Sequence, residues 1–340
     1  MDWIKFPKVD LHRHLEGSLR FSTLEEIAAS PEYQRPGEEI ERLRSLLGPD
    51  DSRRSPEAFL AKFPIIRGFF VSPEMIARLA YEAVADAAAD GLRYLELRFN
   101  PAALGQERSL SLGLAADSVI AGVRKAENDF DILVRLIVTV NRAEAMSAGQ
   151  LMQVAAERLS EGVVGIDLAG DEVHIPADPY VDLFNRANSM GLGTTAHAGE
   201  WAGAEKVRFA IEELKADRIG HGIRIVEDAE VLALARERNS VFEVCITSNI
   251  QTNAVAGLAG HPLAAMAHEH GLKVTLNTDD PGLSGICLSG ELSLAHEKFG
   301  FSIEEIRGMT LEAVDRAFLD SKTRESLRSR LESDFRALDL

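Results

Sequence analysis

Two histidines near the start of the chain are the first residues whose spacing could do chemistry. His12 and His14 follow residues 8–11, a run that reads as a short strand. Side chains two positions apart on a strand point to the same face, so both imidazoles can aim at one point. Neutral imidazoles are common zinc ligands, but a His-x-His pair on its own is more typical of ordinary surface or core histidines. The pair predicts a metal site only together with other polar residues.

Such residues recur in four later stretches of the chain. These stretches are Gly170-Asp171-Glu172, His197-Ala198-Gly199-Glu200, Gly220-His221-Gly222 and Asn277-Thr278-Asp279-Asp280. Three imidazoles and one carboxylate suit a catalytic zinc ion, which keeps a position for water and lowers the pKa of that water to about 7. The sequence therefore offers a candidate ligand set of His12, His14, His197 and Asp279.

The neighbouring carboxylates of Asp279 and Asp280 permit two interpretations. If strand geometry persists, they point in opposite directions, so that one can bind a metal while the other faces a substrate. A helix cap or a pair of loop residues is an equally ordinary reading of Asp-Asp.

The elements that would bring these stretches together follow a regular order. Strand candidates lie at residues 8–11, 92–99, 132–140, 163–168, 192–197, 218–221, 241–245 and 273–277, and a helical pattern precedes each one after the first. This alternation predicts parallel strands. Eight of them in 340 residues favour a closed (β/α)₈ TIM barrel over an open doubly wound sheet. The carboxyl ends of barrel strands meet at one mouth, where the polar stretches would converge.

Two parts of the chain depart from this repeat. Residues 20–70 contain polar stretches at 30–37 and 48–55 and then a helical stripe of Phe59, Leu60 and Phe63. The stripe predicts either a helix packed on the core or a hydrophobic lid over the barrel mouth. Residues 302–340 are helical by pattern and would complete the outer ring. No linker divides the chain, so a single domain over residues 1–340 is expected.

Composition excludes several classes of protein. The formal net charge of −17 argues against nucleic acid or an anionic membrane as a partner. Two distant cysteines, Cys245 and Cys287, cannot form a disulfide framework. The first strand begins too early for a signal peptide, and no apolar run reaches the roughly 18 residues of a membrane span. We therefore expect a cytoplasmic protein.

Taken together, the motifs resemble those of the adenosine deaminase family, in order from residue 7 to about 295. The family implies a TIM barrel that holds one zinc ion per subunit and hydrolyses the 6-amino group of a purine nucleoside, releasing ammonia. Its partner is then a small-molecule nucleoside in purine metabolism, while the oligomeric state stays open. The motifs are His12-Arg13-His14-Leu15-Glu16-Gly17-Ser18, residues 165–172, His197-Ala198-Gly199-Glu200, residues 218–222, Thr247-Ser248-Asn249 and residues 277–281.

The resemblance also implies a role for each site residue. Zinc would be held by His12, His14, His197 and Asp279, and the hydroxide that it activates would attack C6 of the purine. Glu200 would protonate N1, which needs a carboxyl group that keeps its proton. His221 would orient the attacking water and either stabilise or deprotonate it. Asp280 would accept a hydrogen bond at N7, and the Gly170 amide would donate one to N3. Further substrate contacts would come from His14, Glu16, Phe59 and Phe63.

One position departs from the family pattern. Glu16 stands where adenosine deaminases commonly carry aspartate, whose carboxylate contacts the ribose 5′-hydroxyl. The longer side chain leaves three alternatives to adenosine and 2′-deoxyadenosine as the substrate: a 5′-substituted adenosine, aminodeoxyfutalosine or free adenine.

Two further interpretations of the whole chain are another hydrolase of the same barrel superfamily and a barrel without catalytic activity. The first often needs a carboxylated lysine, and no lysine stands at residues 167–170; the second would be favoured by loss of a ligand or of Glu200.

Overall fold

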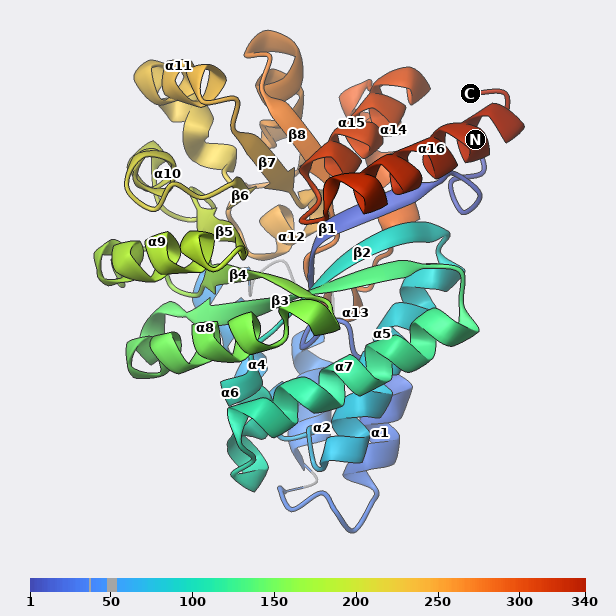
Figure 1. Ribbon diagram of the computed structural model, residues 1–340, viewed down its shortest axis with the longest axis vertical. Coiled ribbons are helices and arrows are strands. Elements are labelled where there is room, and N and C mark those ends of the chain that lie inside the picture. Colours follow the sequence, from blue (N-terminus) through green and yellow to red (C-terminus); the bar gives the residue numbers. More distant parts are fainter. Residues whose placement is uncertain (37, 48–53) are drawn as a thin grey trace.

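The computed structural model describes residues 1–36, 38–47 and 54–340. Its eight strands pair in parallel in the order of the sequence. Figure 1 shows them at the centre of the molecule with helices around them, which confirms the predicted barrel. The strands are β1 (Lys8–His14), β2 (Leu92–Phe99), β3 (Leu133–Asn141), β4 (Val163–Ala169), β5 (Gly193–Ala198), β6 (Arg218–His221), β7 (Val241–Val244) and β8 (Lys273–Leu276).

The seam of the barrel, between β8 and β1, is closed by residues of the predicted site. The backbone N–H of Asp279 donates to the carbonyl of His12 (2.8 Å), and the N–H of His14 donates to the carbonyl of Asp279 (2.8 Å). Asp279 has φ of +63°, a backbone region that non-glycine residues rarely occupy and that clusters at functional sites. The same backbone hydrogen bonds therefore close the sheet and position the side chains of His12, His14 and Asp279.

The helices lie outside the strands and after the barrel, as the helical patterns predict. Helix α5 begins after Ser72, which accepts a hydrogen bond from the N–H of Met75 and is followed by a proline. Helix α15 begins with a capping box, in which Ser302 pairs with Glu305. The helices are α1 (Phe21–Ala28), α2 (Glu38–Leu47), α3 (Pro56–Leu60), α4 (Phe63–Arg67), α5 (Pro73–Ala89), α6 (Pro101–Gly105), α7 (Leu112–Asp129), α8 (Ala148–Glu157), α9 (Val181–Ser189), α10 (Ala204–Glu212), α11 (Ala229–Glu237), α12 (Ile246–Gln251), α13 (Pro281–Ser284), α14 (Leu288–Phe299), α15 (Ile303–Arg316) and α16 (Ser321–Ala337).

Two helical expectations need correction. The stripe around Phe59 is two short helices, α3 and α4, because Pro64 lacks an N–H and starts a new helix instead of continuing the first. The helix expected at residues 262–270 contains a π-helix, Ala265–Glu269. Of the predicted polar loops, residue 37 and residues 48–53 lie outside the described part of the chain.

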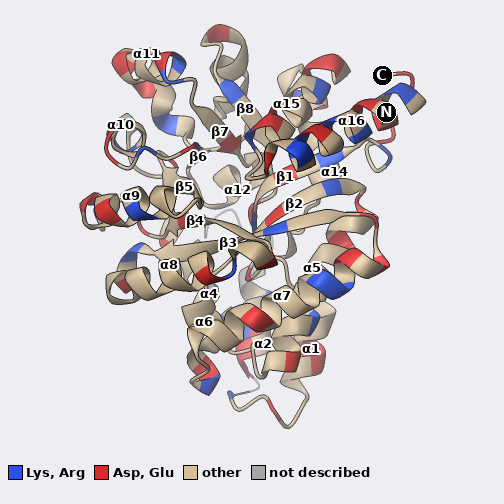
Figure 2. Cartoon of the chain, viewed as in Figure 1, with Lys and Arg blue, Asp and Glu red and all other residues tan. Residues whose placement is uncertain are grey.

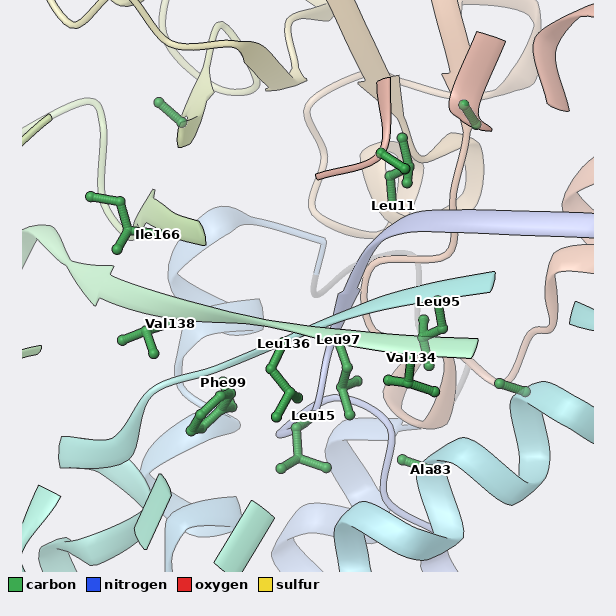
Figure 3. Close-up of a cluster of buried hydrophobic side chains, with 14 of the residues drawn as sticks. Leu11, Leu15, Ala83, Leu95, Leu97, Phe99, Val134, Leu136, Val138 and Ile166 are labelled. Atoms are coloured by element: carbon green, nitrogen blue, oxygen red, sulfur yellow. The ribbon is translucent and has the colours of Figure 1, made fainter. Parts of the chain in front are cut away.

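Successive side chains of a strand point to opposite faces, and β2 places apolar side chains on one face and charged ones on the other. On β2, Leu95, Leu97 and Phe99 belong to the apolar cluster beneath the helices, together with side chains of β3 (Figure 3). The alternate residues Glu96 and Arg98 are fully buried and contact charged groups of other strands, so they fill the barrel interior. This interior is an ionic network rather than the apolar layers common in such barrels.

The charged side chains outside the barrel are of both signs. Figure 2 shows acidic and basic residues interspersed along the outer helices. In the described ranges, none of the helices combines the length and apolar character that a bilayer crossing requires.

Candidate active site

The four predicted metal ligands come together at the carboxyl ends of β1, β5 and β8. The Nε2 atom of His197 lies 3.1 Å from that of His12 and 3.3 Å from that of His14. Asp279 Oδ1 lies 3.4 Å from the Nε2 atoms of both His12 and His14. Nitrogen and oxygen atoms at such spacing surround a point about 2.0–2.2 Å from each, the bond length of zinc.

The protonation chemistry of these side chains also fits a cation. Burial lowers the pKa of His14 to about 3, so its imidazole is neutral and its lone pair is free. His12 Nδ1–H donates to Glu243 Oε2 (2.9 Å) and His197 Nδ1–H donates to Asp167 Oδ1 (3.1 Å). These bonds leave the lone pairs of both rings on Nε2, where the four ligands meet. The donor set therefore fits a zinc ion.

Asp167 and Glu243 belong to the site but escape sequence reasoning. Each is a fully buried acid within a strand, on β4 and β7 respectively. An acid inside an apolar strand run is the one signal that could have indicated them, because a buried charge needs a partner. Ser248, on α12, belongs to a motif that the sequence shows but was given no role there; it donates its hydroxyl proton to Asp279 Oδ2 (2.7 Å).

Two arginines hold the acids that orient the histidines. Arg98 contacts both Glu243 and Asp167, at 3.2 Å from the latter, and Arg218 contacts Glu243 and Glu96. Burial alone would raise the pKa of Glu243, but the two guanidinium groups outweigh burial and hold it well below its usual range. Glu243 is therefore a carboxylate in the centre of the barrel.

The network continues to the other end of the barrel. Arg218 Nη1 donates to the carbonyl of Arg316 (2.7 Å), and its guanidinium lies 3.7 Å from the ring centroid of Phe318. The N–H of Phe318 donates to Glu96 Oε1 (2.7 Å). A chain of contacts thus runs from the segment between α15 and α16 to the imidazole of His12.

A cavity of about 290 Å³ opens beside the ligand cluster, near the lower limit of about 300–1,000 Å³ for small-molecule sites. A larger hollow of about 760 Å³ lies between α7 and the segment after α15; it holds charges of both signs, and none of the ligand clusters found among the described residues lies there. All the predicted site residues except His12 line the smaller cavity: His14, Glu16, Phe59, Phe63, Gly170, His197, Glu200, His221, Asp279 and Asp280.

Glu200 is a buried acid that keeps its proton. Its side chain is 4% exposed, and Thr252 donates a hydrogen bond to Oε1 (3.2 Å). Burial, followed by the charges of Asp279 and Glu172, raises the pKa of Glu200 well above its usual value. A carboxyl group in this state can donate a proton at neutral pH.

The tautomer of His221 follows from a chain of hydrogen bonds. The N–H of Leu263 donates to His261 Nδ1 (3.2 Å), and burial lowers the pKa of His261 to about 4, so the proton of this ring is on Nε2. His261 Nε2–H donates to Asn249 Oδ1 (3.2 Å), and the Asn249 amide then donates to His221 Nδ1 (3.0 Å). His221, whose pKa is lowered by burial, therefore carries its proton on Nε2, 3.6 Å from Glu200 Oε2.

Gly170 also lines the cavity, at the end of β4. Its φ of +101° is a backbone conformation that favours glycine. A Cβ at this position would lie 2.9 Å from Asn141 Oδ1. Any other residue would be strained here and would push on the cavity wall.

A (β/α)₈ barrel with three imidazoles and a carboxylate at its mouth defines a metal-dependent hydrolase. The family model described as Adenosine deaminase matches residues 7–334. The chain belongs to the adenosine deaminase family, which confirms the resemblance. It is a hydrolytic deaminase of a 6-aminopurine.

Relatives and solved structures agree with this assignment. An adenosine deaminase of Klebsiella pneumoniae is 38% identical over 96% of this chain and 97% of its own length. The N6-mAMP deaminase MAPDA of Arabidopsis superimposes with a TM-score of 0.87 at 29% identity, over 98% of this chain and all of that one. A cog1816 amidohydrolase of Burkholderia ambifaria, solved with bound Zn, gives a TM-score of 0.89 at 28% identity, over 99% and 92% of the two chains.

Proposed function

We propose that the chain hydrolyses adenosine and 2′-deoxyadenosine to inosine and 2′-deoxyinosine, with release of ammonia. The observation that carries the choice of substrate is the charge of the cavity around Glu16. This carboxyl group is buried and accepts the N–H of Asn100 (3.0 Å), and burial raises its pKa to about 7. Such a group suits a neutral hydroxyl, as on the ribose of a nucleoside.

A 5′-phosphate fits these surroundings poorly. Arg67 is the one guanidinium that lines the described part of the cavity. It is already close to Glu144 Oε1 (3.6 Å), whose other oxygen accepts from Asn100 Nδ2 (2.9 Å). A phosphate beside Glu16 would therefore meet a carboxyl group that is partly ionised at neutral pH, and Arg67 could neutralise it only by leaving Glu144. Like charges left side by side cost several kcal/mol.

Zinc is the metal that we propose for the cluster of His12, His14, His197 and Asp279. When bound, it would supply a Lewis acid that lowers the pKa of a water molecule to about 7. The similar amidohydrolase of Burkholderia ambifaria was solved with bound Zn. Glu243 and Asp167 would hold two of the imidazoles in place for it.

The remaining residues would act on the purine ring. Addition of water at C6 places negative charge on the ring, and Glu200 would neutralise it by protonating N1. His221 would donate its Nε2–H to the attacking water and hold it, because this tautomer has no lone pair there with which to take a proton. The Gly170 N–H would donate to N3. Glu200, ionised by this transfer, would take back one proton of the added water. The other proton would pass to the amino nitrogen as the C6–N bond breaks, which leaves a carbonyl at C6 and releases ammonia.

Asp280 needs a revised role. The nitrogen N7 of adenosine carries a lone pair and no hydrogen, so a partner at N7 has to donate. Burial, followed by the charge of Asp279, raises the pKa of Asp280 well above its usual value. We therefore assign a protonated Asp280 as the donor to N7, in place of the acceptor expected from the resemblance.

Helices α3 and α4 would cover the base. Phe59, Leu60 and Phe63 line the cavity, and the rings of Phe59 and Phe63 lie 5.9 Å apart at an edge-to-face angle. Of the two interpretations of this stripe, we propose the hydrophobic lid. Phe59 is also buried, so it packs on the protein while it faces the cavity.

A substrate panel tests the proposed function. We expect zinc-loaded protein to deaminate adenosine and 2′-deoxyadenosine at least about 100-fold more efficiently, in kcat/KM, than AMP or N6-methyl-AMP, because of the like charges beside the 5′ position. The loss of ultraviolet absorbance on conversion to the 6-oxopurine measures the rate, with adenine and 5′-substituted adenosines alongside. Chelation should abolish turnover and zinc should restore it. Equal or faster turnover of AMP would overturn the nucleoside assignment, and silence of the zinc-loaded protein across the panel would overturn the function.

Gly17 offers a test of Asp280. A Cβ on Gly17 would lie 1.6 Å from Asp280 Oδ1, so Gly17→Ala has to displace that carboxyl group. We expect kcat/KM for adenosine to fall by about 10- to 100-fold, the usual result of misplacing a substrate-orienting group by about 1 Å. Gly149→Ala is the control, since nothing lies within 4 Å of a Cβ there. Full activity of Gly17→Ala would argue against a role for Asp280.

A further inference from the structure

Glu172 is a buried acid that the proposed chemistry leaves without a role. It follows β4, is 1% exposed and does not line the cavity. Its carboxylate accepts backbone hydrogen bonds from four consecutive residues after β5. The donors are the N–H groups of Gly199 (2.8 Å), Glu200 (2.8 Å), Trp201 (2.6 Å) and Ala202 (3.0 Å).

The carbonyl side of the same segment is also held. Arg142 Nη2 donates to the carbonyl of His197 (2.8 Å). Arg224 uses Nη1 to donate to the carbonyl of Trp201 (2.6 Å) and its backbone N–H to donate to that of Gly199 (3.0 Å). The turn that carries Glu200 is thus fixed from both sides by groups of three other segments, which follow β3, β4 and β6. Its backbone position does not depend on the side chain of Glu200.

A carboxylate is well suited to this arrangement. Hydrogen bonds from N–H groups to an ionised acceptor are shorter and about twice as strong as neutral ones. Glu172 Oε1 accepts from three donors and Oε2 from the fourth. A glutamine keeps one accepting oxygen and turns an NH₂ group toward an N–H, so at least one buried donor would lose its partner.

We propose that Glu172 is a positioning residue that holds Glu200 where it meets the purine. The inference rests on the proposed role of Glu200. The negative charge of Glu172 has a second effect in the same direction, because it adds to the burial that keeps Glu200 protonated. Glu172 does not line the cavity, and its four hydrogen bonds go to the turn that carries Glu200, so it acts on the reaction through Glu200.

A double-mutant cycle tests this coupling. We expect Glu172→Gln to lower kcat for adenosine about 10- to 100-fold, with KM changed less than about threefold. The reason is that the carboxyl group of Glu200 would be displaced slightly from its position opposite N1. In a Glu200→Gln background the same change should cost less than about threefold. Two readouts are independent of turnover. The amount of zinc bound per subunit should equal that of the parent, and the Kd of the product inosine should stay within about threefold of the parent value.

The outcomes separate the inference from the proposed function. If Glu200→Gln alone keeps full kcat, the proposed role of Glu200 fails. If Glu200→Gln is nearly inactive while Glu172→Gln keeps full kcat, or if the two effects multiply, the positioning role fails and the function stands. Loss of zinc or of inosine binding in Glu172→Gln would also overturn it, since the residue would then be a structural support of the whole site.

Two further variants complete the experiment. If Glu172→Gln does not fold, Glu172→Asp is used in the same cycle; it keeps the charge but withdraws the carboxylate by one methylene group, and we expect the same split between kcat and KM. The matched control is Glu82→Gln. Glu82 is also a buried acid, on α5, and it is bonded to Thr23 and Arg78, which do not line the cavity. Its substitution should leave kcat unchanged.

Discussion

Replacing Glu200 by glutamine should lower kcat for adenosine by about 10²–10⁴-fold, the usual contribution of a general acid. Glutamine has nearly the shape of a protonated glutamic acid, but its amide cannot transfer a proton to N1. Because Glu200 is buried and keeps its proton, the change removes no charge from the folded protein. We therefore expect the free energy of unfolding to change by less than about 1 kcal/mol.

The measurement combines single-turnover absorbance with thermal unfolding of the zinc-loaded variant. A variant that keeps kcat within threefold of the parent would contradict the role of Glu200. A large loss of stability would contradict the conclusion that the buried acid is neutral. Thr252→Val is the companion variant: it removes the hydroxyl that donates to Glu200 Oε1 and should have a much smaller effect on kcat, because that bond does not supply the proton.

Replacing Glu243 by glutamine should destabilise the protein by about 3–5 kcal/mol, the cost of removing one partner from a buried ion pair. Arg98 and Arg218 would remain buried without the carboxylate between them. Glutamine keeps one accepting oxygen, which cannot serve Arg98, Arg218 and the Nδ1–H of His12 together. Loss of the bond that orients a ligating histidine typically costs 10- to 100-fold in metal affinity. Both effects come from one residue that never touches the cavity.

Chemical denaturation measures the first effect and competition with a zinc chelator the second. Asp86→Asn is the control, since Asp86 pairs with Arg20 on the surface at about half exposure and such pairs contribute about 0–1 kcal/mol. An unfolding free energy of Glu243→Gln within 1 kcal/mol of the parent would show that the arginines find other partners.

Local patterns were sufficient to predict the barrel and its mouth. The strand expected at residues 92–99 is β2 in full, and that at 218–221 is β6, because each follows a helical pattern at the place where the repeat requires a strand. The histidines expected on one face of a strand do lie in β1, which extends to His14 rather than ending at residue 11. Residues at strand ends are easy to find because barrel topology sends them to one place.

The supports of the site could not be predicted in the same way. His12 and Glu243 are 231 positions apart, and no local periodicity pairs a histidine with a distant strand acid. Glu172 was visible within its motif, but its four donors are backbone groups of another loop, and backbone groups leave no trace in residue types. The division of the stripe into α3 and α4 could have been predicted, because the position of Pro64 in the sequence indicates where a helix is interrupted.

The contacts of Arg316 and Phe318 with the barrel interior also bear on how the chain is made. A ribosome adds roughly 5–20 residues per second, so the last metal ligand, Asp279, leaves it seconds before the residues that fix Arg218. Until then Arg218 lacks its carbonyl acceptor and its aromatic neighbour, and the acid that it shares with His12 is less firmly held. A nascent chain can thus assemble all its strands and still await its final segment before its ligand cluster is fully supported.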